Sequence, residues 1–379
     1  MEVTGLRLKL ADSTVTGNAA VELNRRVPLL AARLESDRLD LRPLLGYDSK
    51  TSPEAKKFDR AARKKIFPDT PFAIEILPRF ETSVDAKIAS LILPAMVAEK
   101  FDAKATLKSS RLNVRLIASK IGGGRLSFDL SLVPMDKQID VSTSVIAKSV
   151  NLSLMLKGLK IQSAMEGILD LTARLKGRGT SVAALMAGLD GDFIAILSNG
   201  RMPLAYLNLI GTDIGSSLVH LLNPFGDPVD AAALNCLVVD FNIAKGQAKS
   251  DVLLIDDPRK TLVGLAEVDL KTEDPDVWIE TKPKEGIGLE GVGKVSVSLK
   301  ELTKPFKLSG TLAHPRVELD TMRTAKTIGT AMLGPLGIAW LLVSGSSGKE
   351  APCANALKIA GEGAYEMESG SRDKGAAIK

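Results

Sequence analysis

The chain has 379 residues, with 50 Lys and Arg against 45 Asp and Glu, which leaves a formal net charge of +5. So small an excess over this length argues against nucleic acid as the main partner. Only two His and two Cys are present, which excludes zinc clusters and disulfide-rich scaffolds. Hydrophobic residues make up 45% but aromatic residues only 4%. This composition favours long aliphatic surfaces over aromatic-lined pockets for small molecules.

The first residues show the alternation of a half-buried strand. Leu6, Leu8 and Leu10 alternate with basic residues. The first residues do not show a basic stretch followed by an apolar run, so the sequence does not predict a signal peptide or an N-terminal anchor there. Because a strand of this kind needs a partner, we expect the chain to be a fragment whose residues 1–46 form a partial upstream strand repeat. Residues 47–70 are charged and rich in Ala, which predicts a solvated helix or a linker.

Alternation then dominates residues 71–320. Leu112, Val114 and Leu116 are separated by polar residues, and turn sequences such as Asp274-Pro275 end the runs. Consecutive short strands that are joined by tight turns pair antiparallel and leave one apolar and one polar face. The sequence therefore predicts a mainly β fold, an elongated curved antiparallel sheet with a few short helices.

Few segments favour helices. Short helices are predicted near residues 180–189 and 202–222, an apolar helical segment at 321–345, and a flexible tail at 346–379. Residues 327–345 contain no charged side chain but are interrupted by Gly and Pro. Three interpretations stay open for them: a helix that caps the end of the sheet, contact with a membrane surface, or a membrane span.

A sheet with one apolar face has to cover that face with helices, a second sheet or a ligand. The strand-like runs far outnumber the helical ones, so two interpretations stay open. The sheet either closes on its own side chains or forms a groove that shelters lipid acyl chains. The alternating rows supply the candidate groove residues, namely Leu107, Leu112, Val114, Leu116, Leu126, Phe128, Leu130, Val141, Val239, Phe241, Val268 and Leu270.

The motifs for enzyme chemistry are weak. Gly288–Lys294 has the spacing of a phosphate-binding loop, but Val295 stands where Ser or Thr would hold Mg²⁺, and a strand rather than a helix is predicted to follow. His220 and His314 have no nucleophile or second ligand at a useful spacing. We therefore expect no catalytic residue, metal site or cofactor, and no enzymatic activity.

Several stretches between Ile168 and Asp320 resemble a known family. They are DLTARLKGRGTSVAALMAGLDGDF (Asp170–Phe193), LNCLVVDFNIAKGQAKSD (Leu234–Asp251), LIDDPRKTLVGLAEVDLKTEDPDVWIETKPK (Leu254–Lys284) and KLSGTLAHPRVELD (Lys307–Asp320). They resemble the C-terminal region of the bacterial AsmA family, and Leu30–Leu45 resembles the preceding repeat of that family.

The resemblance implies a periplasmic protein of Gram-negative bacteria, which an N-terminal helix holds in the inner membrane. The family is related to repeating β-groove lipid transporters and is linked to outer-membrane lipid homeostasis and assembly. The implied partners are phospholipid or another acyl lipid, the inner-membrane surface and envelope assembly proteins, with no nucleic acid. Compared with the family, we expect this chain to lack the N-terminal helix and most of the N-terminal half.

Cys236 and Cys353 are the only thiols. If the chain is periplasmic, the oxidising compartment favours a disulfide between them, which would tie the tail to the sheet. Two unconnected thiols are the alternative, because sequence gives no geometry.

Two hypotheses for function remain. In the first, the chain holds acyl chains in an apolar β-groove and contributes to phospholipid transport. In the second, it is a structural or regulatory module for envelope assembly with a closed β core, which acts through protein contacts.

Overall fold

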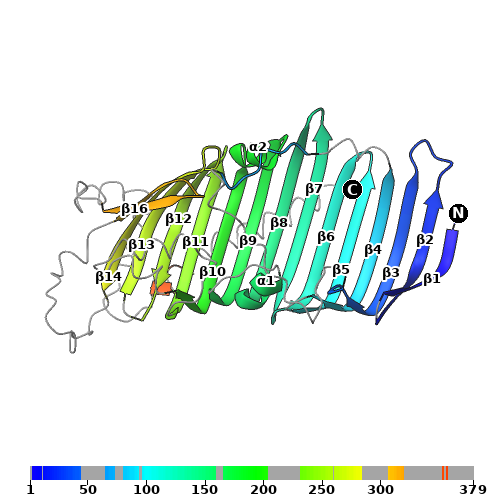
Figure 1. Ribbon diagram of the computed structural model, residues 1–379, viewed down its shortest axis with the longest axis horizontal. Helices are drawn as coiled ribbons and strands as arrows, with labels where there is room; N and C mark the ends of the chain where they lie inside the picture. The colour runs from blue at the N-terminus through cyan, green and yellow to red at the C-terminus, as the bar shows by residue number, and fades with distance from the viewer. Residues whose placement is uncertain are drawn as a thin grey trace, which may run out of the picture. The chain divides into compact units, whose positions relative to one another are not determined.

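The computed structural model describes residues 2–10, 12–43, 65–72, 80–93, 96–158, 165–203, 231–258, 260–283 and 306–319, together with 352, 353 and 356. Strands dominate this part of the chain (Figure 1). They are β1 (Glu2–Leu10), β2 (Ser13–Glu22), β3 (Leu29–Asp40), β4 (Glu81–Ile92), β5 (Val97–Lys108), β6 (Arg111–Ile121), β7 (Gly124–Met135), β8 (Gln138–Asn151), β9 (Glu166–Gly179), β10 (Asp190–Pro203), β11 (Ala231–Ala244), β12 (Gln247–Asp256), β13 (Lys260–Asp269), β14 (Asp274–Pro283), β15 (Phe306–Gly310) and β16 (Pro315–Leu319).

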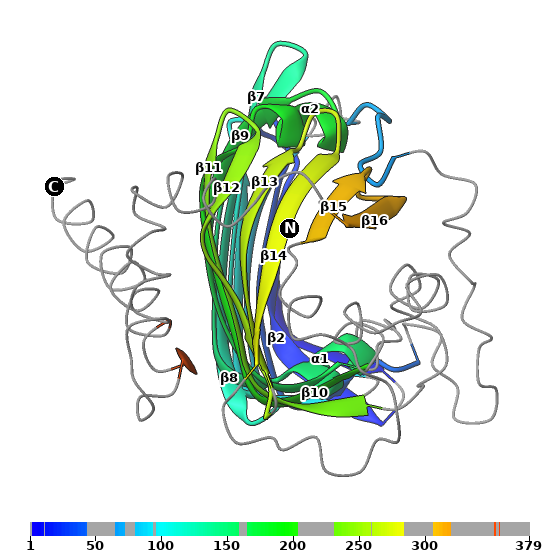
Figure 2. The ribbon, with the colours of Figure 1, turned by 90° about the vertical axis from the view of Figure 1, so that its left-hand side faces the viewer.

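The strands form one 16-stranded sheet in which each is hydrogen-bonded to its neighbours in sequence order, from β1 to β16. In the part of the chain that the structure describes, two short helices lie between strands, α1 (Leu152–Gly158) after β8 and α2 (Val182–Ala187) after β9. The prediction of a mainly β fold with few short helices is confirmed, and the strands of each half of the chain are curved (Figure 2).

The pairing of β3 with β4 differs from the expected antiparallel pattern. β3 and β4 run parallel, with Leu29 opposite Glu81 and Asp40 opposite Ile92. A tight turn cannot join parallel strands, because the chain has to return to the end at which the first strand began. The connection from 41 to 80 is long enough for that return. Sequence alternation alone did not reveal it.

The chain divides into two compact units. Unit 1 comprises Met1–Ser163 and Ile168–Gly191, and unit 2 comprises Ala164–Gly167 and Asp192–Lys379. Tight hairpin turns occur in both. In unit 2, for example, Lys245 and Gly246 both have positive φ and join β11 to β12. Two consecutive residues with positive φ form the turn that matches the twist of a hairpin.

A line of irregularities bends the strands of unit 1 near α1. Lys100 and Ser149 have positive φ, and the pairing register shifts after Ala118 in β6 and after Ala147 in β8. Bulges of this kind kink a strand and increase its twist. In Figure 2 the strand ends near α1 curl toward the side on which α1 lies.

A hydrophobic core fills the bend beside α1. Its most buried members are Ala98, Ala118, Ala147 and Val150, and Met155 of α1 packs against them. Leu154 N donates a hydrogen bond to Asn151 Oδ1 at 3.0 Å, which caps the start of α1. The sequence analysis missed this helix, although an Asn just before an apolar run is a capping signal.

Helix α2 packs on the opposite ends of the strands. A Cβ on Gly179 of β9 would lie 2.5 Å from the backbone N of Leu185, so only glycine allows the helix to approach this closely. Ser181 caps the helix by accepting a hydrogen bond from Ala184 N at 3.2 Å. The predicted helix at 180–189 is therefore present as α2.

The connection after β3 also reaches α2. Ala183 N donates to Pro68 O at 3.1 Å, and Phe72 N donates to Thr180 O at 2.9 Å. Residues 65–70 of the predicted charged helix or linker are not helical. Residues 47–64 of that segment, most of the predicted helix at 202–222 and all of the predicted helix at 321–345 lie outside the described residues.

Candidate functional site

The predicted rows of unit 1 lie on one face of the sheet. Val114 of β6 is opposite Leu130 of β7, and Leu116 is opposite Phe128. The same register continues into the neighbouring strands. The remaining pairs on this face include Leu107–Leu112, Ala105–Val114, Ala118–Leu126, Leu132–Val141, Phe128–Val145 and Thr143–Leu175. We call this surface the apolar face of unit 1.

Burial varies along the strands of this face. Its middle is partly exposed, as at Val114, Leu116, Phe128 and Leu130. Leu107 lies on the same face but is buried. A closed core would bury all of these side chains, so the described residues leave an apolar surface that is only partly covered.

A core beside α1 covers one end of the strands, and α2 covers the other end at β8 and β9. The core with Met155 covers the ends near α1. At the other ends, α2 lies against Gly177 and Gly179, and Leu189 and Ile139 are buried there. The partly exposed rows therefore form a band that runs across the strands between two covered margins.

The other surface, which we call the polar face of unit 1, has the opposite character. Asn113, Arg115 and Ser127 alternate with the apolar residues. Arg115 Nε lies 2.5 Å from Asp129 Oδ1 and Lys120 Nζ lies 2.8 Å from Glu99 Oε1. These charged side chains are exposed, so this face is solvated and is not a core. Exposed ion pairs of this kind contribute little to stability.

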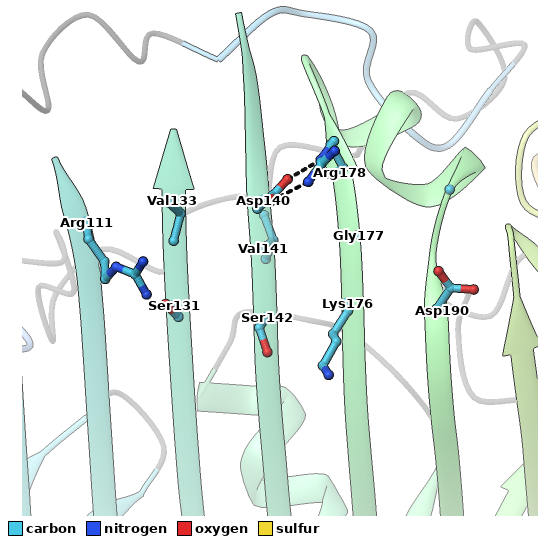
Figure 3. A pocket seen from close by; sticks show the side chains of 11 residues that line it. Arg111, Ser131, Val133, Asp140, Val141, Ser142, Lys176, Gly177, Arg178 and Asp190 are labelled. Atoms are coloured by element: carbon cyan, nitrogen blue, oxygen red, sulfur yellow. Dashed lines mark hydrogen bonds and ion pairs between the residues drawn. The ribbon is translucent and has the colours of Figure 1, made fainter. Parts of the chain in front are cut away.

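A hollow of ≈ 480 Å³ lies on the polar face near α2 (Figure 3). Arg178 forms a two-pronged ion pair with Asp140 there, with Nη2 2.7 Å from Oδ2, and its hydrogen bonds lower the pKa of Asp140. Arg111, Lys176, two serines and Asp190 also line the hollow. This mixed polar lining does not suit an acyl chain.

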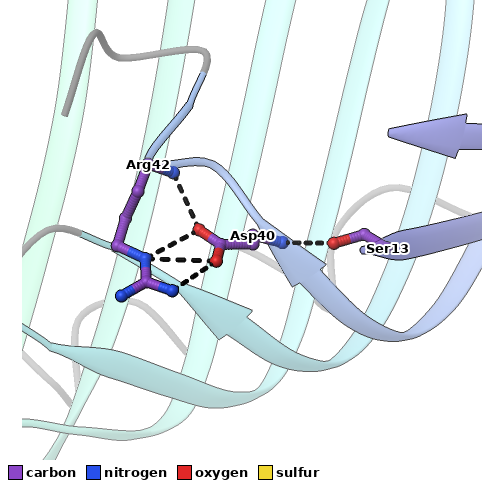
Figure 4. Close-up of polar contacts among 3 residues, drawn as sticks. All are labelled: Ser13, Asp40 and Arg42. Atoms are coloured by element: carbon purple, nitrogen blue, oxygen red, sulfur yellow. Dashed lines mark hydrogen bonds and ion pairs between the residues drawn. The ribbon is translucent and has the colours of Figure 1, made fainter. Parts of the chain in front are cut away.

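A polar cluster fixes the point where the chain leaves β3 (Figure 4). Asp40 N donates to Ser13 Oγ at 2.8 Å, and Arg42 Nη2 lies 2.6 Å from Asp40 Oδ2. The side-chain hydrogen bonds from Arg42 hold the pKa of Asp40 below its ordinary value. The cluster is structural, because it ties β2 and β3 together where the long connection begins.

Unit 2 also has a face that carries its predicted residues. Val239 of β11 is opposite Leu253 of β12, and Val268 of β13 is opposite Ala248. Other members of this face are Leu237, Phe241, Ile255, Leu262, Ala266, Val277 and Ile279. We call it the apolar face of unit 2. Val239, Phe241 and Val268 are partly exposed, whereas Leu270, just after β13, is buried.

The opposite side of unit 2 is apolar as well, and here the chain covers itself. Cys236 is bonded to Cys353, with Cα atoms 6.0 Å apart. The core around this disulfide consists of Ile194, Cys236, Val238, Val252, Leu254 and Ala356. We call this side the covered face of unit 2 and the helical residues Pro352, Cys353 and Ala356 the C-terminal cover. These are the described residues of the predicted flexible tail.

Acidic side chains lie near the covered face. Burial raises the pKa of Asp240 in β11 to about 7, and the charges of Asp251 and Asp192 add to this effect. Asn242 Nδ2 donates to Asp192 Oδ1 at 3.0 Å. Among the described residues, no group of His, Cys, Asp and Glu is arranged to hold a metal ion.

The family model of the AsmA family matches residues 2–253 of this chain, which is well over half of its 379 residues. The chain belongs to the AsmA family. The AsmA family protein YhjG of Escherichia coli strain K12 is 22% identical over 372 residues. That match covers 93% of this chain and 52% of YhjG, so the chain spans about half the length of this curated relative. No solved structure matches the chain.

The family assignment confirms the resemblance. The AsmA model covers all of unit 1 except Met1 and ends within β12, so it begins upstream of the motifs between Ile168 and Asp320 and includes the first two of the four. In this AsmA family chain, no helix among the described residues is long and apolar enough to cross a membrane. His220 and Gly288–Lys294 lie outside those residues, and His314 lies in an exposed turn.

Sequence reasoning missed the covered face and its polar row. Cys236 is opposite Asp256, and Asp256 is opposite Thr261. Asp256 is 2% exposed, and its carboxylate accepts hydrogen bonds from Thr261 Oγ1 at 2.6 Å and Asn235 Nδ2 at 2.7 Å. The Asp256-Asp257-Pro258 sequence suggested only a turn, and no periodicity marks a buried carboxylate beside a disulfide.

Proposed function

We propose that this AsmA family chain holds lipid acyl chains on the apolar face of unit 1 and contributes to phospholipid transport between membranes and to outer-membrane assembly. The observation that carries the proposal is the band of partly exposed residues around Val114, Leu116, Phe128 and Leu130. At ~25 cal/mol per Å² of apolar surface, covering such a band with an acyl chain is strongly favourable.

The shape of the band supports a lipid rather than a compact ligand. It crosses neighbouring strands, which are spaced about 4.8 Å apart, and it lies between the core beside α1 and the end at which α2 packs on β9. An extended hydrocarbon chain matches a long, narrow surface that makes few polar contacts. We propose binding and sliding with no covalent step, so the chain is not an enzyme in this account.

We further propose a periplasmic location at the inner membrane, with phospholipid or another acyl lipid as the ligand and envelope assembly proteins as partners. Family membership supports a role in the envelope. The disulfide between Cys236 and Cys353 is consistent with an oxidising compartment.

Lipid retention tests the proposal. The purified chain is extracted with organic solvent, and phospholipid in the extract is measured by mass spectrometry. Leu116→Asp and Phe128→Asp each place a charge on the band, which should reduce retained lipid by roughly tenfold or more, since burying an unpaired charge costs several kcal/mol.

Ile117→Asp is the matched control. Ile117 is the next residue along β6, but it is 39% exposed and lies on the polar face. This variant should retain as much lipid as the wild-type chain. An empty wild-type extract, or equal lipid in all variants, contradicts the proposal and favours a structural module that acts through protein contacts.

A further inference from the structure

The C-terminal cover lies on a part of unit 2 that would otherwise be an exposed apolar surface. Val238 and Leu254 face each other across β11 and β12 and are 0% and 1% exposed. Ala356 of the cover, 1% exposed, belongs to the same core. In Figure 2 the described residues of the cover (orange-red) lie against one side of these strands. The occupant of this surface is therefore a segment of the chain itself.

The two cysteines that fasten the cover differ in exposure. Cys236 is 1% exposed, whereas Cys353 is only partly buried. We therefore expect a thiolate reagent to attack Sγ of Cys353, which belongs to the more exposed residue. That attack forms a bond between the reagent sulfur and Cys353, breaks the bond between the two protein sulfurs, and leaves Cys236 as a thiolate. A second thiolate then releases Cys353 and becomes part of the oxidised reagent.

The carboxylate of Asp256 lies beside this reaction path. Its Oδ2 is 3.8 Å from Sγ of Cys353. Asp256 is itself buried, and Asn235 and Thr261 hold its two oxygens in place. A fixed negative charge at this distance repels an approaching thiolate, and it opposes the new thiolate that forms on Cys236.

We propose that the C-terminal cover is a permanent part of unit 2, and that Asp256 keeps it so by shielding the Cys236–Cys353 disulfide from thiolate attack. The cover closes one of the two apolar sides of unit 2, and the other side keeps partly exposed residues such as Val239 and Phe241. The proposal does not depend on which ligand contacts those residues.

The test compares two thiol reagents on the folded chain at equal thiolate concentration. One is cysteamine, which carries a positive amine, and the other is 2-mercaptoethanesulfonate, which carries a negative sulfonate. The release of Cys236 and Cys353 is followed by alkylation and mass spectrometry. The chain carries a net charge of +5, so its overall field favours the anionic reagent. The shield predicts the opposite order, with cysteamine faster by about tenfold.

Asp256→Asn removes the charge and keeps the shape, and an amide can still bond to both Asn235 and Thr261. In this variant both reagents should react faster, and the preference for cysteamine should disappear. Asp276→Asn is the matched control, because it changes the net charge equally at an exposed site paired with Lys307. It should behave as the wild type.

Two results would overturn the proposal that Asp256 shields the disulfide. One is equal reagent preference in the wild-type chain and in Asp256→Asn. The other is a wild-type chain that reacts at least as fast with the anionic reagent, which decides the matter even if Asp256→Asn does not fold.

Discussion

The two units bury their sheets in different ways. In unit 1, the side opposite the apolar face is a solvated surface of ion pairs such as Arg115–Asp129. In unit 2, the side opposite its own apolar face is itself apolar around Val238 and Leu254, and the C-terminal cover closes it. Each unit is thereby left with one partly exposed apolar face, but unit 1 achieves this by strand alternation and unit 2 needs an added segment.

This difference shows what is required for a unit to keep only one partly exposed apolar face. Where every second residue is charged or polar, as at Asn113 and Arg115, water covers the second side at no cost. Where both sides are apolar, part of the chain has to be fixed over one of them. The disulfide supplies that fixation across a sequence separation of 117 residues.

The largest expected effect on stability comes from removing the disulfide in unit 2. The double variant Cys236→Ala and Cys353→Ala should lose about 4 to 5 kcal/mol of unfolding free energy, because closing a loop of this length constrains the unfolded chain by that amount. It should also bind more of a hydrophobic dye than the wild-type chain does, because the surface beneath the cover adds to the apolar faces that are already partly exposed. Chemical denaturation and dye fluorescence measure both effects. Unchanged stability and dye binding would show that the cover stays in place without the bond.

An apolar residue can be changed to Asp on the covered face of unit 2 and on the polar face of unit 1, which compares these two surfaces directly. Val238→Asp should destabilise the chain by about 3 to 5 kcal/mol, because it buries an unpaired charge beneath the cover. Ile117→Asp on the polar face of unit 1 should change stability by less than about 0.5 kcal/mol, as exposed substitutions do. Urea denaturation measures both. Equal losses at the two positions would remove the distinction between the units.

Asp240 in unit 2 should make the free energy of unfolding depend on pH. Its pKa of about 7 in the folded chain exceeds the value of about 3.9 for an unfolded Asp. The folded state therefore holds an extra proton between these values, so this residue lowers the free energy of unfolding as pH rises from about 4 to about 7. Asp240→Asn should remove that loss. Denaturation at pH 5 and pH 8 checks it, and an identical pH profile in the variant would contradict this assignment.

Sequence predicted the strands well because period-two alternation is a local property. It placed Val114, Leu116, Phe128 and Leu130 on one face, and the register agrees. Helix α1 was missed because it is short and its apolar residues continue those of β8. The bulge after Ala147 was also invisible, since it changes which side the following residues face.

Long-range features were beyond sequence reasoning. Alternation does not state that β3 and β4 run parallel, because the direction of pairing depends on how the connection returns. The two cysteines suggested a disulfide without showing that Cys353 would bring Ala356 onto Val238 and Leu254. Asp256 gave no signal, since its role depends on the distance to a sulfur atom 97 residues away in sequence.

The central claim is that lipid contacts the apolar face of unit 1 and not its polar face. The most direct measurement introduces a photoreactive benzophenone side chain at position 116 or at position 117, irradiates cells, and analyses the purified chain by mass spectrometry. The account predicts phospholipid adducts at position 116 and none at position 117. Adducts at both positions, or at neither, would contradict it.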